Sequence, residues 1–150
     1  MTLSLFLHLM GVVVWVGGMF FAYMVLRPVA ASALEPPQRL TLWAGVFGKF
    51  FPWVWVSVAL ILVTGLYMMM LLSSATMPHY VWTMLVLGIA MMLIFAHLFF
   101  APYGRLKQAV STQDWKAGGA ALMQIRRMVG INLSLGLLTI AVVFLGRALI

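Results

Sequence analysis

The sequence predicts an all-α integral membrane protein whose four helices cross the bilayer and pack into one bundle. Of its 150 residues, 65% are hydrophobic and only 7% are charged, whereas a soluble domain carries roughly 25% charged residues. A small soluble fold could not bury so much apolar surface. Four uncharged segments are each long enough to cross the hydrocarbon core, which takes about 20 helical residues. We therefore expect one membrane domain over residues 1–150, with the lipid bilayer as its main surroundings.

The predicted spans contain no charged residue, and the segments that connect them differ in length and charge. They cover residues 3–26, 50–72, 80–101 and 128–146, and no Lys, Arg, Asp or Glu occurs within any of them. The connection over 73–79 is short and neutral, whereas the other two connections are longer and basic. Within these basic connections, Glu35-Pro-Pro and Ala117-Gly-Gly predict irregular structure.

The distribution of positive charge predicts the topology. Nine Lys and Arg residues oppose Glu35 and Asp114, which gives a net charge of +7. In a soluble protein this excess would suggest nucleic acid, but here no nucleic-acid partner is expected, because the charges gather beside two connections that share one side of the membrane. These residues are Arg27, Arg39, Lys49, Arg105, Lys107, Lys116, Arg126 and Arg127. Positive residues near span ends stay in the cytoplasm, so we expect an N-out, C-out arrangement.

The first span presents one face of small and aromatic residues beginning at a histidine. His8, Gly11, Trp15, Gly18 and Ala22 follow at helical spacings of three and four residues, which places them on one side of the helix. Small residues allow another helix to approach closely, either within the bundle or in a homo-oligomer. His8 is then directed into the protein. A buried membrane histidine is a candidate functional residue; the alternative is an imidazole that is only hydrogen-bonded across helices.

Sulfur-bearing side chains are predicted near the level of His8. Met84 and one of the consecutive methionines around Met69 lie toward the same outer side, where the short connection adds His79. Imidazole and thioether groups suit the soft ion Cu(I). The chain has no cysteine, so a soft site would depend on these groups. The alternative is that methionine fills apolar packing gaps.

His97 is predicted to lie deeper in the membrane than His8. Counted from the outer boundary, the two differ by eleven residues, or roughly 16 Å at ~1.5 Å per residue. We therefore expect separate sites or successive stations of one path. The alternative for His97 is a hydrogen bond to Asn132, which lies at a similar depth in the fourth span.

Several segments resemble the copper-resistance D (CopD) family over most of the chain. The resemblance rests on His8-Leu-Met-Gly through Ala22, Arg27-Pro28, Leu42-Trp-Ala-Gly45, Phe51-Pro-Trp53, and His97 near Pro102. It implies a multi-pass protein of the bacterial inner membrane that handles copper in uptake or tolerance. For this copper hypothesis, the residues considered above give His8, Met84, His79, Met69 and His97 as candidate metal ligands.

The chain is also distantly similar to HemJ-type protoporphyrinogen oxidase, a haem-binding membrane enzyme. His8, Trp82 and His97 fit the spacing of that group, but Val86 occupies the position of its functional lysine. The similarity implies an alternative, a b-type haem redox protein with His8 and Met84 as axial ligands and Arg147 beside a propionate. Enzymatic activity is expected only in that case. A third possibility is a structural or partner subunit.

Overall fold

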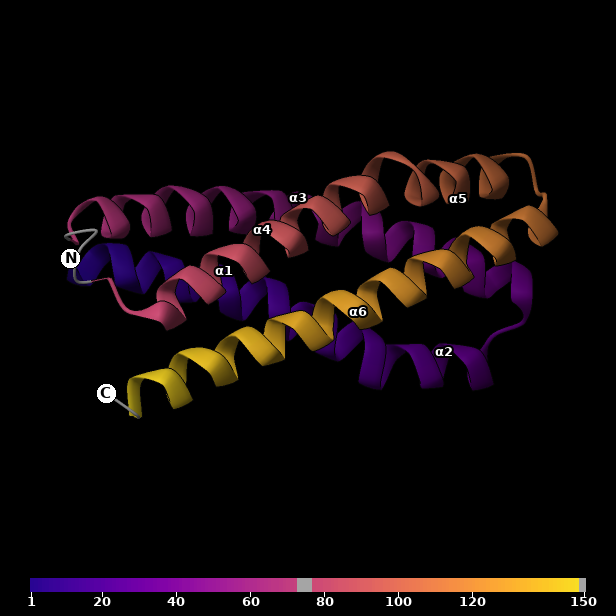
Figure 1. Cartoon of the computed structure of the whole chain (residues 1–150). Helices are drawn as coiled ribbons and strands as arrows, with labels where there is room; N and C mark the ends of the chain where they lie inside the picture. The colour runs from indigo at the N-terminus through magenta and orange to yellow at the C-terminus, as the bar shows by residue number, and fades with distance from the viewer. Residues whose placement is uncertain (73–76, 149–150) are drawn as a thin grey trace.

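The computed structural model describes residues 1–72 and 77–148, which are almost entirely helical. Four helical rods are long and apolar enough to cross a membrane: Thr2–Ala33, Pro36–Met70, His79–Ser111 and Trp115–Ala148. They lie side by side as an elongated bundle (Figure 1). The predicted fold class, an all-α membrane bundle of four helices, is confirmed.

The rods divide into shorter elements at prolines and turns. In chain order the elements are α1 (Thr2–Phe20), the π-helical turn η1 (Phe21–Leu26), α2 (Arg27–Ala33), α3 (Pro36–Met70), α4 (His79–Phe100), α5 (Pro102–Ser111) and α6 (Trp115–Ala148). Proline lacks an N–H donor, and its ring crowds the carbonyl four residues earlier. The wide turn η1 lies directly before Pro28 and carries the helix past it, so the first rod extends beyond Leu26, where the predicted span ended.

The connections at the charged end are much shorter than predicted, because the helices continue into them. Glu35 does mark a break, since it directly precedes α3. The prediction of irregular structure at 117–119 is wrong, because these residues lie inside α6. Gly118 is buried there, and a Cβ on it would lie 3.1 Å from Leu40 Cδ1 and 3.4 Å from Ala109 Cβ. The glycine serves close helix packing and not a turn.

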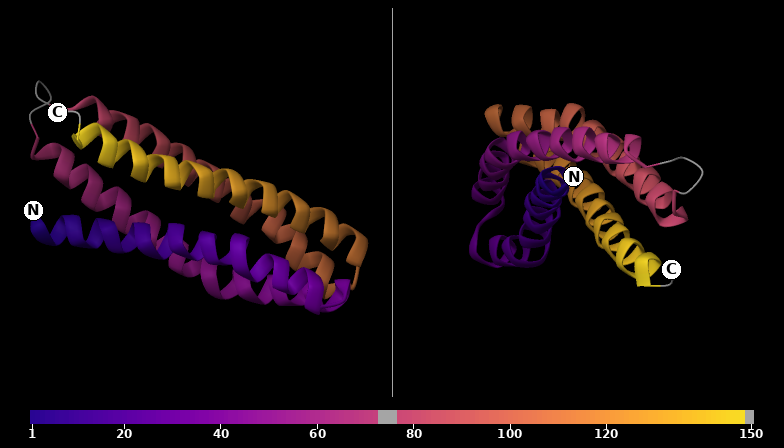
Figure 2. Two further views of the ribbon diagram at one scale, coloured as in Figure 1. Left: turned by 90° about the horizontal axis from the view of Figure 1, so that it is seen from below. Right: turned by 90° about the vertical axis from the view of Figure 1, so that its left-hand side faces the viewer.

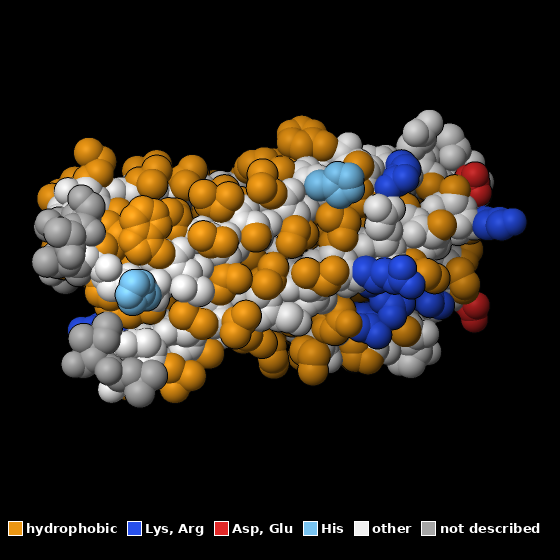
Figure 3. All heavy atoms as spheres, in the orientation of Figure 1, with side chains coloured by type: hydrophobic (Ala, Val, Ile, Leu, Met, Phe, Trp, Pro, Cys, Tyr) orange, Lys and Arg blue, Asp and Glu red, His pale blue; other side chains and the backbone are white. Residues whose placement is uncertain are grey.

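The rods pair as two helical hairpins, as expected. α1 packs along α3, and α4 and α5 pack along α6. The start of α1 and the end of α6 lie at one end of the bundle, called here the terminal end, while the α2–α3 and α5–α6 connections lie at the other (Figures 1 and 2). Lys and Arg side chains gather at that second end, called the basic end (Figure 3). The two basic connections therefore share one end, as the charge pattern predicted.

The small residues of α1 allow the close approach of α3. A Cβ on Gly11 would lie 2.9 Å from Ile61 Cγ1 and 3.1 Å from the carbonyl oxygen of Ser57. A Cβ on Gly18 would overlap the ring of Phe50. Gly11, Trp15 and Ala22 are buried, so the predicted face is confirmed as a packing surface within the bundle.

Aromatic rings join the two hairpins nearer the basic end. Phe51 of α3 stacks on Phe47 at 4.9 Å and meets Tyr103 of α5 edge-on at 4.9 Å. It also meets Phe95 of α4 at 5.4 Å, and Phe95 in turn contacts Trp15 of α1 at 6.1 Å. Edge-to-face pairs of this kind add about 0.5–1.5 kcal/mol each beyond the burial of their area. The core is therefore tightest between the bundle middle and the basic end.

The packing of α1 on α3 predicts different effects of leucine at two nearby glycines. Gly11→Leu should lower the melting temperature in detergent by several degrees, because overpacking costs typically about 1–3 kcal/mol. Gly17→Leu is the control, since nothing lies within 4 Å of a Cβ there. Circular dichroism melts of both variants measure the difference. Equal melting temperatures for the two variants would contradict the close α1–α3 contact.

Candidate functional site

The imidazole of His8 lies against α3 and is held by a threonine. Its Nδ1 lies 3.1 Å from Thr64 Oγ1, and Thr64 is buried. A Cβ on the next residue, Gly65, would lie 3.2 Å from His8 Cε1, so the absence of a side chain leaves room for the ring. The prediction that His8 faces another helix of the bundle is confirmed.

The hydrogen bonds of Thr64 decide which nitrogen of His8 carries the proton. The Thr64 hydroxyl donates to the Leu60 carbonyl, so its single hydrogen is already used. Thr64 Oγ1 is then left as an acceptor, which favours the tautomer in which His8 Nδ1–H donates. In a neutral imidazole the other nitrogen, Nε2, keeps its lone pair. Protein metal sites commonly use this arrangement, because the second-shell acceptor sets both the tautomer and the orientation of the ring.

Thr64 was not among the predicted site residues, although the sequence contains a signal for it. Threonine in a membrane span often hydrogen-bonds across helices, and Thr64 lies at the depth expected for His8. Helical periodicity also relates Thr64 to Met68, four residues on and on the same face. Met68 and Met69 are both half-buried, so burial does not distinguish them. The α3 register therefore favours Met68 over the predicted Met69 as a thioether on the His8 side of the helix.

The remaining predicted ligands outside α3 belong to α4 and α6. Met84 is half-buried on α4, which belongs to the other hairpin, and His79 is exposed at the start of α4. Arg147 is exposed in the last turn of α6, at the terminal end. Ligation by Met84, Met69, His79 or His97, and an Arg147–propionate contact, stay predictions.

His97 and Asn132 do not form the hydrogen bond that the sequence allowed. His97 is exposed on α4. Asn132 is only 2% exposed, and its Nδ2 donates to the Met91 carbonyl at 3.2 Å. Asn132 faces the bundle interior, whereas His97 lies on the outside.

The kinds of side chain that gather together limit the metals that could bind. Within residues 1–72 and 77–148, no group of three or more His, Cys, Asp or Glu side chains is positioned to hold a metal ion. A metal site in this region would therefore combine an imidazole with thioethers or amide oxygens. Neutral sulfur and nitrogen donors favour a soft monovalent ion.

Residues 44–145 match the family model described as Copper resistance protein D. The chain belongs to the CopD family. The resemblance stated from sequence is thereby confirmed, and the matched region of the CopD protein includes Thr64, Met84 and His97 but begins after His8. No curated protein and no solved structure matches the chain. The comparisons give no support to the HemJ similarity, so the haem alternative rests on the residues alone.

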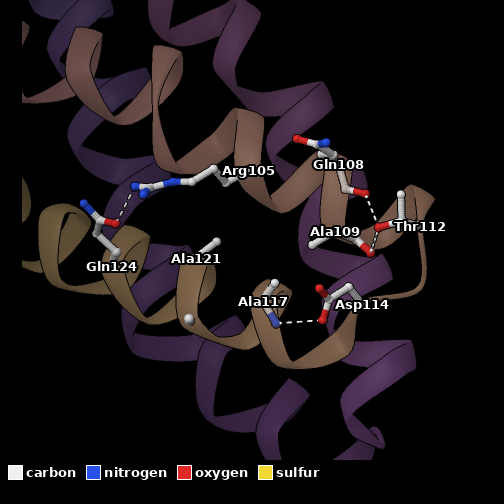
Figure 4. A pocket seen from close by; sticks show the side chains of 9 residues that line it. Arg105, Gln108, Ala109, Thr112, Asp114, Ala117, Ala121 and Gln124 are labelled. Carbon is white, nitrogen blue, oxygen red and sulfur yellow. Dashed lines mark hydrogen bonds between the residues drawn. The ribbon is translucent and has the colours of Figure 1, made fainter.

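A cavity lies at the basic end of the CopD bundle, and its lining differs in chemistry from the surroundings of His8. It has a volume of about 360 Å³ and is bounded by α5 and the start of α6 (Figure 4). Arg105 Nη2 donates to Gln124 Oε1 at 2.6 Å, and the Ala117 N–H donates to Asp114 Oδ1 at 3.1 Å. Its lining contains neither imidazole nor thioether, so it lacks the donors that Cu(I) prefers.

The His8–Thr64 hydrogen bond predicts one tautomer for this ring. Nitrogen NMR of protein labelled with ¹⁵N-histidine should show His8 as the neutral Nδ1–H form. Thr64→Val removes the acceptor and should shift the His8 signals toward a mixture of tautomers, while Thr64→Ser should retain the wild-type pattern. The exposed His79 provides the internal comparison. A wild-type Nε2–H signal for His8 would contradict the assignment.

Proposed function

We propose that this CopD-family protein takes up monovalent copper from the outer side of the bacterial inner membrane, in copper uptake or tolerance. The observation that supports the proposal best is the orientation of His8. The ring is anchored through Nδ1 to Thr64 at 3.1 Å, which leaves the lone pair of Nε2 for an ion. Copper is here the cargo of the protein, not a resident cofactor.

The character of the surrounding side chains supports Cu(I) over a divalent ion. Met68 lies on the Thr64 face of α3, and Met84 is the thioether on the facing hairpin that the sequence predicts at this level. No carboxylate occurs in any predicted span. A divalent ion such as Mg²⁺ or Ca²⁺ requires oxygen ligands, usually carboxylates, whereas Cu(I) accepts neutral sulfur and nitrogen. The entry site is thus His8 Nε2 with Met68 and Met84.

His8→Ala is expected to abolish the entry site. Purified protein titrated with Cu(I) against a chromophoric chelator under reducing conditions should lose high-affinity binding, because the imidazole anchored by Thr64 is gone. Thr64→Val should weaken binding by about 10–100-fold, as is typical when a second-shell partner of a ligating histidine is removed.

Thr41→Val is the matched control for Thr64→Val, since Thr41 also donates to the carbonyl four residues earlier but lies near the other end of α3. Its affinity should stay close to wild type. Unchanged binding in His8→Ala would contradict the proposed entry site. A red preparation whose Soret absorbance disappears in His8→Ala would assign the ring to haem iron and overturn the copper proposal.

We propose that the terminal end faces outward and the basic end faces the cytoplasm. The gathering of Lys and Arg at one end supports this orientation, because positive residues near span ends resist translocation. A cytoplasmic exit for the ion follows from it.

Because the chain has no cysteine, single introduced cysteines report the orientation directly. Met77→Cys should react with a membrane-impermeant maleimide in intact spheroplasts. Gln113→Cys, in the α5–α6 connection, should react only after lysis. Labelling of Gln113→Cys in intact spheroplasts would reverse the assigned direction.

A further inference from the structure

A second polar group is buried where all four rods meet. Asn132 of α6 is 2% exposed, and its Nδ2 donates to the Met91 carbonyl of α4. Its Oδ1 is buried and has no hydrogen-bond partner within the part of the chain that the structure describes. Buried polar atoms are nearly always paired, so this oxygen points to a ligand.

Asn132 lines a small internal cavity of about 20 Å³, which is large enough for one particle the size of a water molecule. Met19 is the sulfur-bearing residue among those that line it. Most other lining residues are aromatic: Trp15, Phe47, Phe50, Phe51 and Phe95. Because Nδ2 already donates to α4, Oδ1 is the polar atom of Asn132 that is available to bind a ligand in the cavity.

The chemistry of the lining distinguishes between two occupants, a water molecule and a soft monovalent cation. A buried water typically makes about three hydrogen bonds, whereas the side chains around this cavity offer Asn132 Oδ1 as their one strong acceptor. A soft monovalent cation is better served, because it interacts with a thioether and with aromatic π-systems, and the amide oxygen adds a neutral donor without a charge. Met19 is 4% exposed and Trp15 is 3% exposed, so such an ion would be shielded from lipid and water alike.

We propose that Met19 and Asn132 form an internal Cu(I) station between the entry site and the basic end. This inference rests on the proposed copper function. Met19 follows His8 by eleven residues on the first helical rod, which places it roughly 16 Å further along the bundle. With no carboxylate nearby to hold the ion, binding is weak enough for release, as conduction through successive sites requires.

The experiment compares two buried methionines of equal exposure. Met19→Leu removes the thioether from the cavity while nearly conserving side-chain volume. Met91→Leu is the matched control, since Met91 is also 4% exposed but does not line the cavity. Full-length protein in nanodiscs is dialysed to equilibrium against a fixed concentration of Cu(I) under reducing conditions, and bound copper per chain is measured without removing the free metal.

The expected result is that Met19→Leu binds one copper ion per chain fewer than wild type, while Met91→Leu binds as many as wild type. Asn132→Leu, checked for folding by gel filtration, should reproduce the loss. Wild-type stoichiometry in both Met19→Leu and Asn132→Leu overturns the internal station, as does an equal loss in Met91→Leu.

His8→Ala separates this inference from the proposed function. If copper binding is lost in His8→Ala and unaffected by Met19→Leu, the entry site stands and the internal station is overturned. If binding is lost in Met19→Leu and unaffected by His8→Ala, the internal station stands and the entry site is overturned.

Discussion

The close approach of α1 to α3 is the contact on which the rest of the structure depends. In a bilayer, helices gain little from hiding apolar surface from one another, so they associate through tight packing and interhelical hydrogen bonds. Gly11 and Gly18 on α1, and Gly65 on α3, have no side chain that would hold the two helices apart. At this separation His8 can reach Thr64. A wider separation would leave the imidazole without its acceptor, and the tautomer of the ring would no longer be set.

Most of the fold could be predicted because membrane helices follow a few strong physical constraints. The length of uncharged runs predicted four rods, and the positions of Lys and Arg predicted that two connections share one end. Helical spacing predicted that Gly11 and Trp15 face the interior. Each of these predictions depends on local sequence and on the thickness of the bilayer alone.

The features that could not be predicted depend on contacts between distant segments. A glycine pair at 118–119 is typical of a turn, yet Gly118 lies within α6. Glycine suits this helical position because Leu40 and Ala109 occupy the space that a side chain would fill. Thr64 was not predicted as a site residue, and Asn132 was considered as a partner of His97 but donates to the Met91 carbonyl; both outcomes depend on which face of the partner helix lies opposite. His97 was given two possible roles from depth alone, and its exposure depends on how α4 rotates against α6.

The length of the rods has a mechanical consequence. α3 alone contains 35 residues, or about 50 Å of helix at ~1.5 Å per residue, whereas the hydrocarbon core is only about 30 Å thick. Unless it is strongly tilted, a substantial part of each rod therefore stands in the headgroup layer and the water beyond it. At the basic end, where the charges gather, this projecting portion forms a short rigid stalk. Any soluble protein that meets the bundle there encounters a preformed helical platform, and docking on it would require no folding of loops.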